Sequence, residues 1–110
     1  MRKIIVLALL AAAPIVHAAS FDCRKELNRI EQQICWDPEL SRLDYQLDEG
    51  FSTLALSLSA HDRVTREQRA WLGRRNACGT MECIRLAYVE RIAEVEGQIR
   101  EELPELAQTR

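Results

Sequence analysis

Residues 38–58, PELSRLDYQLDEGFSTLALSL, carry the apolar pattern that decides the fold class. Apolar residues recur every three or four positions, which keeps one face of a helix toward a core. Strand-like alternation of apolar and polar residues does not occur over any useful length. We therefore expect a helix from Pro38 to about Leu58, with an apolar stripe of Leu40, Leu43, Leu47, Phe51, Leu54 and Leu58.

Local signals mark the start of this helix and one irregularity inside it. Asp37 is a favourable N-cap, and Pro38 suits the first helical position, where no backbone N–H is needed. Gly50 interrupts the helix at a cost of up to about 1 kcal/mol relative to alanine. We expect either a kink or a point of close packing at Gly50.

Helical spacing also predicts three neighbouring helices. A short one, at about 28–35, begins with Asn28 and Glu31 in a capping box. Another begins between 60 and 66, with Ser59 or Thr65 as possible caps, and ends near Cys78. A last one follows the cap Thr80 and stops before Pro104. Their expected core residues are Leu27, Ile30, Ile34, Val64, Trp71, Leu72, Met81, Ile84, Tyr88, Ile92, Val95 and Ile99. The prediction is an all-α, up-and-down bundle of three to four helices.

Residues 1–19 resemble a secretory signal. A basic start, an apolar run from Ile4 to Ala13 and small residues near Ala18 are typical of such leaders. The apolar run is about half the length of a membrane-spanning helix, so we prefer cleavage to an uncleaved anchor. We expect the cut after Ala18 or Ala19. Because Cys23 lies too far from this cut for lipid attachment, we expect a soluble periplasmic or secreted bacterial protein, with its domain at 20–103 and a frayed tail at 104–110.

All four cysteines, Cys23, Cys35, Cys78 and Cys83, follow the expected leader. An even number of cysteines in a short exported chain favours disulfides. Three pairings are possible, and we favour the two that are local in sequence, Cys23–Cys35 and Cys78–Cys83. A four-thiolate zinc site is the rival, but eleven and four intervening residues fit structural zinc sites poorly. No C-x-x-C redox motif is present.

Charge and composition argue for a protein partner. The whole chain holds 15 basic and 17 acidic residues. Because Arg2 and Lys3 leave with the leader, the mature chain carries about four net negative charges. This balance argues against nucleic acid, whose binders usually present a basic surface. It favours attraction to basic proteins.

Residues for catalysis or metal binding are sparse. Past the leader, His61 is the one histidine, and we interpret it as a solvated residue between two helices. The carboxylates near the C-terminus alternate with arginines at helical spacing, as on a solvated helix face. A glycosidase needs two carboxylates across a sugar cleft, and so small a bundle has little room for one. We therefore predict no enzymatic activity, no metal and no cofactor.

Arginines cluster around one tryptophan. Arginine and tryptophan are enriched among the residues that dominate protein interfaces. We favour Trp71 as a core residue, with the arginines beside it as a binding surface; the alternative is that they are only solvated flanks. Trp36 either packs on the first disulfide or stands partly exposed. The candidate partner-binding residues are Arg69, Trp71, Arg74, Arg75 and Arg85.

Two groups of residues together resemble the LprI-type lysozyme-inhibitor-like family. The first group is Phe21-Asp22-Cys23, Glu31, Ile34-Cys35, Asp37-Pro38, Leu40 and Leu43-Asp44. The second is Gln68-Arg69, Trp71-Leu72, Arg75, Cys78, Cys83, Tyr88 and Arg91-Ile92. The resemblance covers nearly the whole mature chain.

The resemblance implies a small exported helical domain that inhibits lysozyme and protects the bacterial wall. Such an inhibitor must block a cleft that holds two catalytic carboxylates. Arginine is well suited to pair with them, because it can make bidentate contacts. Arg69, Arg74, Arg75 and Arg85 are the candidates for this role. The alternative is a non-catalytic adaptor in the cell envelope. An exposed apolar strip that includes Trp36, Phe51 or Tyr45 would favour this alternative.

Overall fold

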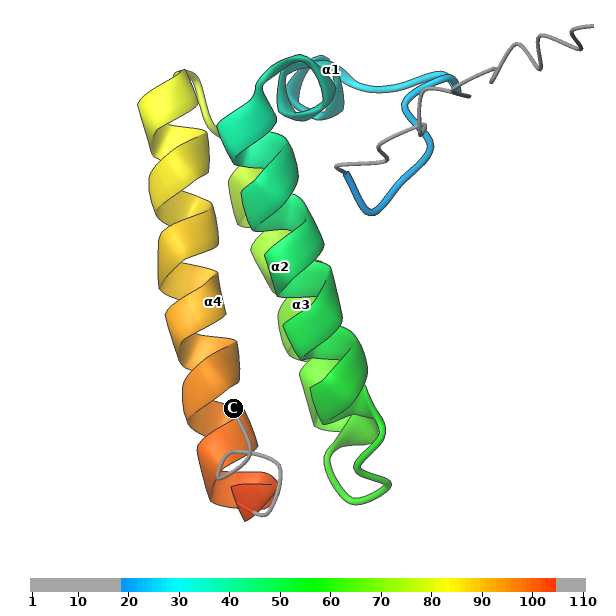
Figure 1. Cartoon of the computed structure of the whole chain (residues 1–110), viewed down its shortest axis with the longest axis vertical. Helices are drawn as coiled ribbons and strands as arrows, with labels where there is room; N and C mark the ends of the chain where they lie inside the picture. Colours follow the sequence, from blue (N-terminus) through cyan, green and yellow to red (C-terminus); the bar gives the residue numbers. More distant parts are fainter. Residues whose placement is uncertain (1–18, 105–110) are drawn as a thin grey trace, which may run out of the picture.

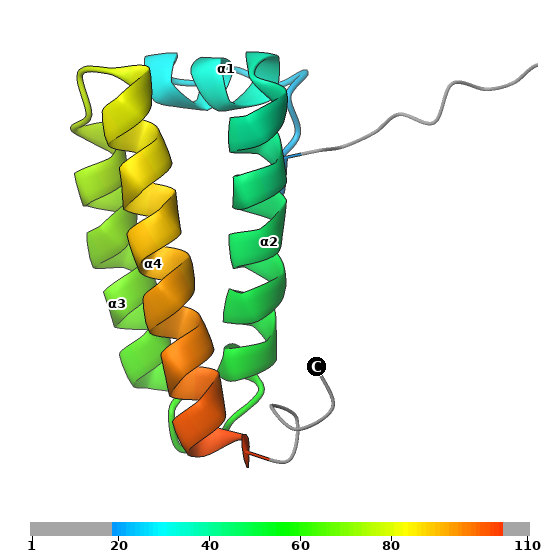
Figure 2. The same cartoon turned by 60° about the vertical axis from the view of Figure 1, so that its left-hand side comes forward.

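A computed structural model describes residues 19–104, which form a bundle of four helices in this part of the chain (Figure 1). The helices are α1 (Arg29–Trp36), α2 (Pro38–Ala55), α3 (His61–Asn76) and α4 (Met81–Glu102). The three long helices run up and down beside one another, and α1 lies across one end of them (Figure 2). The predicted all-α bundle is confirmed. Most of the expected leader and tail, residues 1–18 and 105–110, lies outside the described residues.

Three of the expected helix starts are built as the sequence predicts. The Asn28 side chain accepts from the backbone N–H of Glu31, and the Glu31 carboxylate accepts from the N–H of Asn28. The Asp37 carboxylate accepts from the N–H of Leu40, at the N-terminus of α2. The Thr80 hydroxyl accepts from the N–H of Cys83. Each cap satisfies a backbone donor that the first helical turn would leave unpaired.

The connection between α2 and α3 differs from the prediction. Helix α2 ends at Ala55 rather than near Leu58, and Leu58 is 96 % exposed. The chain must reverse between two antiparallel helices here, so Leu58 leaves the apolar face that its spacing predicted. The cap predictions for Ser59 and Thr65 were also wrong, because α3 follows Ala60 and has no side-chain cap. His61 is exposed at the start of α3, and its Nδ1 lies 2.9 Å from the carbonyl oxygen of Ala55.

The core is a continuous apolar cluster along the inner faces of all four helices, with the most extensive interface between α2 and α4. Gly50 is a point of close packing, because a Cβ there would lie 3.1 Å from Cγ1 of Val95. Met81, expected in the core, is 39 % exposed at the first turn of α4. The buried apolar residues of the helices are Ile30, Ile34, Leu40, Leu43, Leu47, Leu54, Val64, Trp71, Ile84, Tyr88, Ile92, Val95 and Ile99.

Candidate functional site at the disulfide end of the bundle

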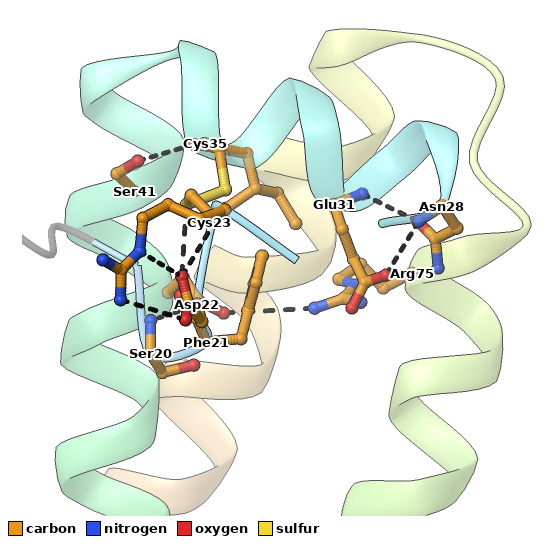
Figure 3. The surroundings of a disulfide bond; sticks show 12 residues. Ser20, Phe21, Asp22, Cys23, Asn28, Glu31, Cys35, Ser41 and Arg75 are labelled. Carbon is orange, nitrogen blue, oxygen red and sulfur yellow. Dashed lines mark hydrogen bonds and ion pairs between the residues drawn. A yellow bond between two sulfur atoms is a disulfide. The ribbon is translucent and has the colours of Figure 1, made fainter. Parts of the chain in front are cut away.

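Both predicted disulfides are confirmed, and both lie at the end of the bundle that α1 crosses. Cys23–Cys35 fastens the N-terminal strap, residues 19–27, to the last turn of α1 (Figure 3). Cys78–Cys83 spans the corner between α3 and α4. The Arg29 guanidinium donates to the carbonyl oxygen of Cys78 at 3.1 Å, which connects α1 to that corner. We call this region, with the N-terminal halves of α2 and α4, the disulfide end.

A buried polar network lies inside the disulfide end. Asp44 on α2 is 5 % exposed, and its Oδ1 accepts from the Tyr88 hydroxyl on α4 at 2.6 Å. Its Oδ2 accepts from the backbone N–H of Ser20 on the strap, also at 2.6 Å. Arg75 on α3 is 3 % exposed and donates through Nη1 to the Tyr88 oxygen at 3.1 Å. The network therefore joins three helices and the strap, and Asn76 completes it by accepting from the Arg75 guanidinium.

Burial strongly affects the Tyr88 hydroxyl. Loss of solvent raises the pKa of Tyr88 far above its usual value, and the neighbouring Asp44 carboxylate raises it further. Arg75 acts in the opposite direction but does not compensate. Tyr88 therefore stays a neutral hydrogen-bond donor, which suits the acceptor oxygen of Asp44.

Trp71 packs against this network as a core residue, as predicted. It is 2 % exposed, and its ring meets that of Tyr88 edge to face at 4.9 Å between centroids. The Arg75 guanidinium carbon lies 5.7 Å from the Trp71 ring centroid, within reach of a cation–π interaction. The indole N–H donates to the carbonyl oxygen of Ala87 at 3.0 Å. Trp71 thus stabilises the α3–α4 pair rather than facing solvent.

A second buried arginine, Arg91, was not anticipated as a structural residue. It is 2 % exposed, donates through Nε to Gln68 on α3, and pairs with Glu94 one turn along α4. Helical spacing carries a signal for all three buried charges. Asp44 falls between Leu40 and Leu47 in the α2 stripe, Arg75 follows Trp71 by four, and Arg91 follows Tyr88 by three.

The structure divides the five candidate partner-binding residues. Trp71 and Arg75 are buried and do not reach the surface, because both are used inside the bundle. Arg85 is partly exposed, but its guanidinium donates to both oxygens of Glu82. This contact raises the pKa of Arg85 and lowers that of Glu82. Arg69 and Arg74 remain exposed on α3, with no ion pair to any residue of 19–104.

Arg74 stands at a shallow hollow between α3 and α4. The hollow has a volume of about 580 Å³, and the Cys78–Cys83 disulfide forms part of its lining. Leu86, 44 % exposed, lines it together with Glu90 and Glu94. The Arg74 guanidinium, the Leu86 side chain and the carboxylates of Glu90 and Glu94 therefore lie around the corner between α3 and α4, which the Cys78–Cys83 disulfide holds together.

Trp36 is the most exposed aromatic side chain of the described residues. It is 86 % exposed at the C-terminus of α1, next to Cys35. One hollow of about 550 Å³ lies between Trp36 and the strap, and another of about 420 Å³ separates it from Met81. Of the two alternatives for Trp36, exposure is the one the structure shows. Tyr45, on α2, is 50 % exposed.

Within residues 19–104, no group of three or more histidine, cysteine or acidic side chains is arranged to hold a metal ion. In the same range, no helix is long and apolar enough to cross a bilayer. No family model matches the chain, and neither a curated protein nor a solved structure matches it.

Proposed function

We propose that this chain is an exported, non-catalytic binding protein of the bacterial cell envelope, and that it inhibits lysozyme. The observation that carries the proposal is the position of Arg74. Its guanidinium is exposed, has no ion-pair partner among residues 19–104, and stands on the disulfide-linked corner of α3 and α4. Because the disulfide holds the backbone of this corner, docking of Arg74 in an acidic cleft has to order its side chain but not the chain that carries it.

Two further features support the proposal. The disulfides are compatible with an oxidising compartment, as expected behind a secretory leader. The resemblance to LprI-type proteins rests in part on Gln68, Arg69, Trp71, Arg75 and Arg91. Within the bundle, Gln68, Trp71, Arg75 and Arg91 are used for packing or internal hydrogen bonds. Of these five residues, Arg69 alone is exposed, and we assign it to lysozyme together with Arg74, which lines the hollow between α3 and α4.

The test measures cell-wall turnover by a basic animal-type lysozyme, with the oxidised mature protein added in increasing amounts. We expect dose-dependent inhibition, and an inhibition constant at least tenfold weaker for Arg74→Ala, since loss of one charged interface contact costs about 2 kcal/mol or more. Arg100→Ala is the matched control, because Arg100 is an exposed arginine on α4 with no ion pair in the described range. No inhibition at high micromolar concentration would refute the proposal for this class of lysozyme.

Trp36 favours a second candidate function, a protein–protein adaptor in the envelope. An exposed tryptophan beside a disulfide offers a large apolar contact that is already held in place. A photo-crosslinking residue at position 36 should then trap one defined envelope protein in living cells. The same residue at position 58 is the control, because Leu58 is even more exposed than Trp36 but lies at the opposite end of the bundle. Identical products from both positions would refute the adaptor function.

A further inference from the structure

Asp44 lacks a directly hydrogen-bonded cation in the described part of the chain. Its donors are a phenol and one backbone N–H, while Nη1 of Arg75 stands 3.9 Å from Oδ1 and donates to Tyr88 instead. A buried carboxylate is costly unless a positive charge and sufficient donors compensate it. Within the described residues, Oδ2 of Asp44 accepts a hydrogen bond from the Ser20 nitrogen alone. The charge on that nitrogen therefore decides whether the buried carboxylate has a directly bonded counter-ion.

The Ser20 nitrogen lies where we expect the leader to be removed. Hydrolysis of the Ala19–Ser20 peptide bond consumes one water, leaves a carboxylate on Ala19 and turns the Ser20 amide nitrogen into an α-amine. At neutral pH this amine takes up a proton and becomes an ammonium group. Cleavage one residue earlier places the ammonium on Ala19, a buried residue that is 4 % exposed.

We propose that Asp44 is the receptor for the mature amino terminus, whose α-ammonium group becomes the counter-ion of this buried carboxylate. The inference rests on the export and leader removal proposed above, but not on lysozyme as the partner. Processing thus replaces the neutral amide donor, 2.6 Å from the Asp44 carboxylate, by a positively charged one, so that the hydrogen bond becomes an ion pair as well.

The strap is built to hold the amino terminus in this position. The Cys23–Cys35 disulfide fixes the chain three residues after Ser20, so little freedom remains to be lost on docking (Figure 3). Phe21 is partly buried and packs against the core next to Ser20. The Asp22 carboxylate already accepts hydrogen bonds from the backbone N–H and the guanidinium of Arg24. Asp22 therefore does not compete for the ammonium group.

The electrostatic surroundings favour a positive charge at the Ser20 nitrogen. Asp48 lies one turn beyond Asp44 on α2, and burial together with the Asp44 charge raises the pKa of its carboxyl. An ammonium group there relieves the repulsion between these two carboxylates. The positive charge of Arg75 would repel an ammonium group, but Arg75 hydrogen bonds to Tyr88 and Asn76 rather than to Asp44. The charged or titratable groups around the site are Asp22 and Arg24 on the strap, Asp44 and Asp48 on α2, Arg75 on α3, and Tyr88 on α4.

The experiment compares oxidised proteins that begin at Ser20, at Ala19, or with a short Gly-Ser extension before Ala19. We expect an α-ammonium pKa above about 9 in the Ser20 form by NMR titration, against about 7.7–8.0 for a free terminus. Because the folded pKa is raised, the added stability is complete below about pH 7.7 and is lost as pH rises through the folded pKa. At pH 7 the Ser20 form should melt about 5 °C above the extended form, with the Ala19 form between them.

Two controls keep this test decisive. Acetylation of the α-amine should remove the advantage without changing any side chain of the network, and Asp44→Asn should remove the pKa shift. An ordinary α-amine pKa in the Ser20 and Ala19 forms, with equal melting of the extended form, would overturn the inference. Sequencing the N-terminus of the exported protein separately tests leader removal, and lysozyme inhibition is measured independently of both.

Discussion

The two ends of the bundle are held by different kinds of interaction. The disulfide end contains both covalent links and the buried Asp44–Tyr88–Arg75 network. The opposite end, which we call the loop end, comprises the 56–60 connection, the first turn of α3 and the last turns of α4. There Arg63 pairs with Glu67 and Glu102 and donates to Gln98, and its side chain is 40 % exposed.

This difference shows how a small domain distributes its stability. Exposed ion pairs each contribute little, because water screens them and ordering long side chains costs entropy. A buried network with all its partners present is far more sensitive to the loss of one member. We therefore expect the loop end to open locally first, and the disulfide end to keep its shape for the strap, Arg74 and Trp36.

The largest expected effect comes from breaking the buried network. Asp44→Ala should lower the free energy of unfolding by about 3–5 kcal/mol, because it leaves the buried guanidinium of Arg75 without a nearby negative charge. Urea unfolding followed by far-UV circular dichroism measures the loss. Glu49→Ala, an exposed change on the same helix, is the matched control. A loss below about 1 kcal/mol for Asp44→Ala would mean that the two ends do not differ as we argue.

Removing the disulfides one at a time separates their contributions. Replacing Cys23 and Cys35 by alanine should cost about 3 kcal/mol, and replacing Cys78 and Cys83 about 2 kcal/mol, because the first bond closes the longer loop. The sequence separations are twelve and five residues. Denaturant unfolding of the two double variants under oxidising conditions gives both numbers. The reverse order would show that native-state contacts, rather than loop closure, set the values.

Tyr88→Phe tests the polar network more gently. It should cost about 1–3 kcal/mol, because Asp44 loses a donor and Arg75 an acceptor while the ring packing against Trp71 is kept. The raised pKa of Tyr88 adds a pH signature. Above about pH 10 the phenol ionises only in the unfolded chain, so the wild-type protein loses this stability.

The difference between the wild-type protein and Tyr88→Phe should therefore shrink as pH rises above about 10. Urea unfolding of both proteins between pH 8 and pH 11 measures it. Tyr45→Phe is the comparison: Glu49 also raises the pKa of Tyr45, but Tyr45 is half-exposed on α2, so water screens this contact and its difference should shrink by less. A difference that stays constant to pH 11 would contradict a buried, neutral hydroxyl.

What the sequence could predict about these two ends depends on the range of the interactions. The caps at Asn28, Asp37 and Thr80 and both disulfides connect residues close in sequence, so spacing and residue type were sufficient. The network joins residues from four separate segments, and no local pattern says which acid meets which base. The positions of Asp44, Arg75 and Arg91 within apolar stripes did carry a signal for burial, but not for their partners.

The loop end explains the errors in the prediction of the helices. The stripe from Leu40 continues to Leu58 in sequence, yet the helix ends at Ala55, because the chain must turn to bring α3 against α2 and α4. Apolar spacing reports what one helix face could bury, and it does not report where a neighbouring helix stops covering that face. The 96 % exposure of Leu58 is the consequence.

The smallest expected effect lies at the loop end. Arg63→Ala should lower the free energy of unfolding by less than about 1 kcal/mol, because its ion pairs are largely solvated. Its effect should be local: hydrogen exchange should accelerate at the N-terminus of α3 and near Glu102, while amides around Tyr88 keep their protection. High salt should reproduce part of this change in the wild-type protein, because it screens exposed pairs more than buried ones. Equal acceleration at both ends would show that the bundle opens as one unit.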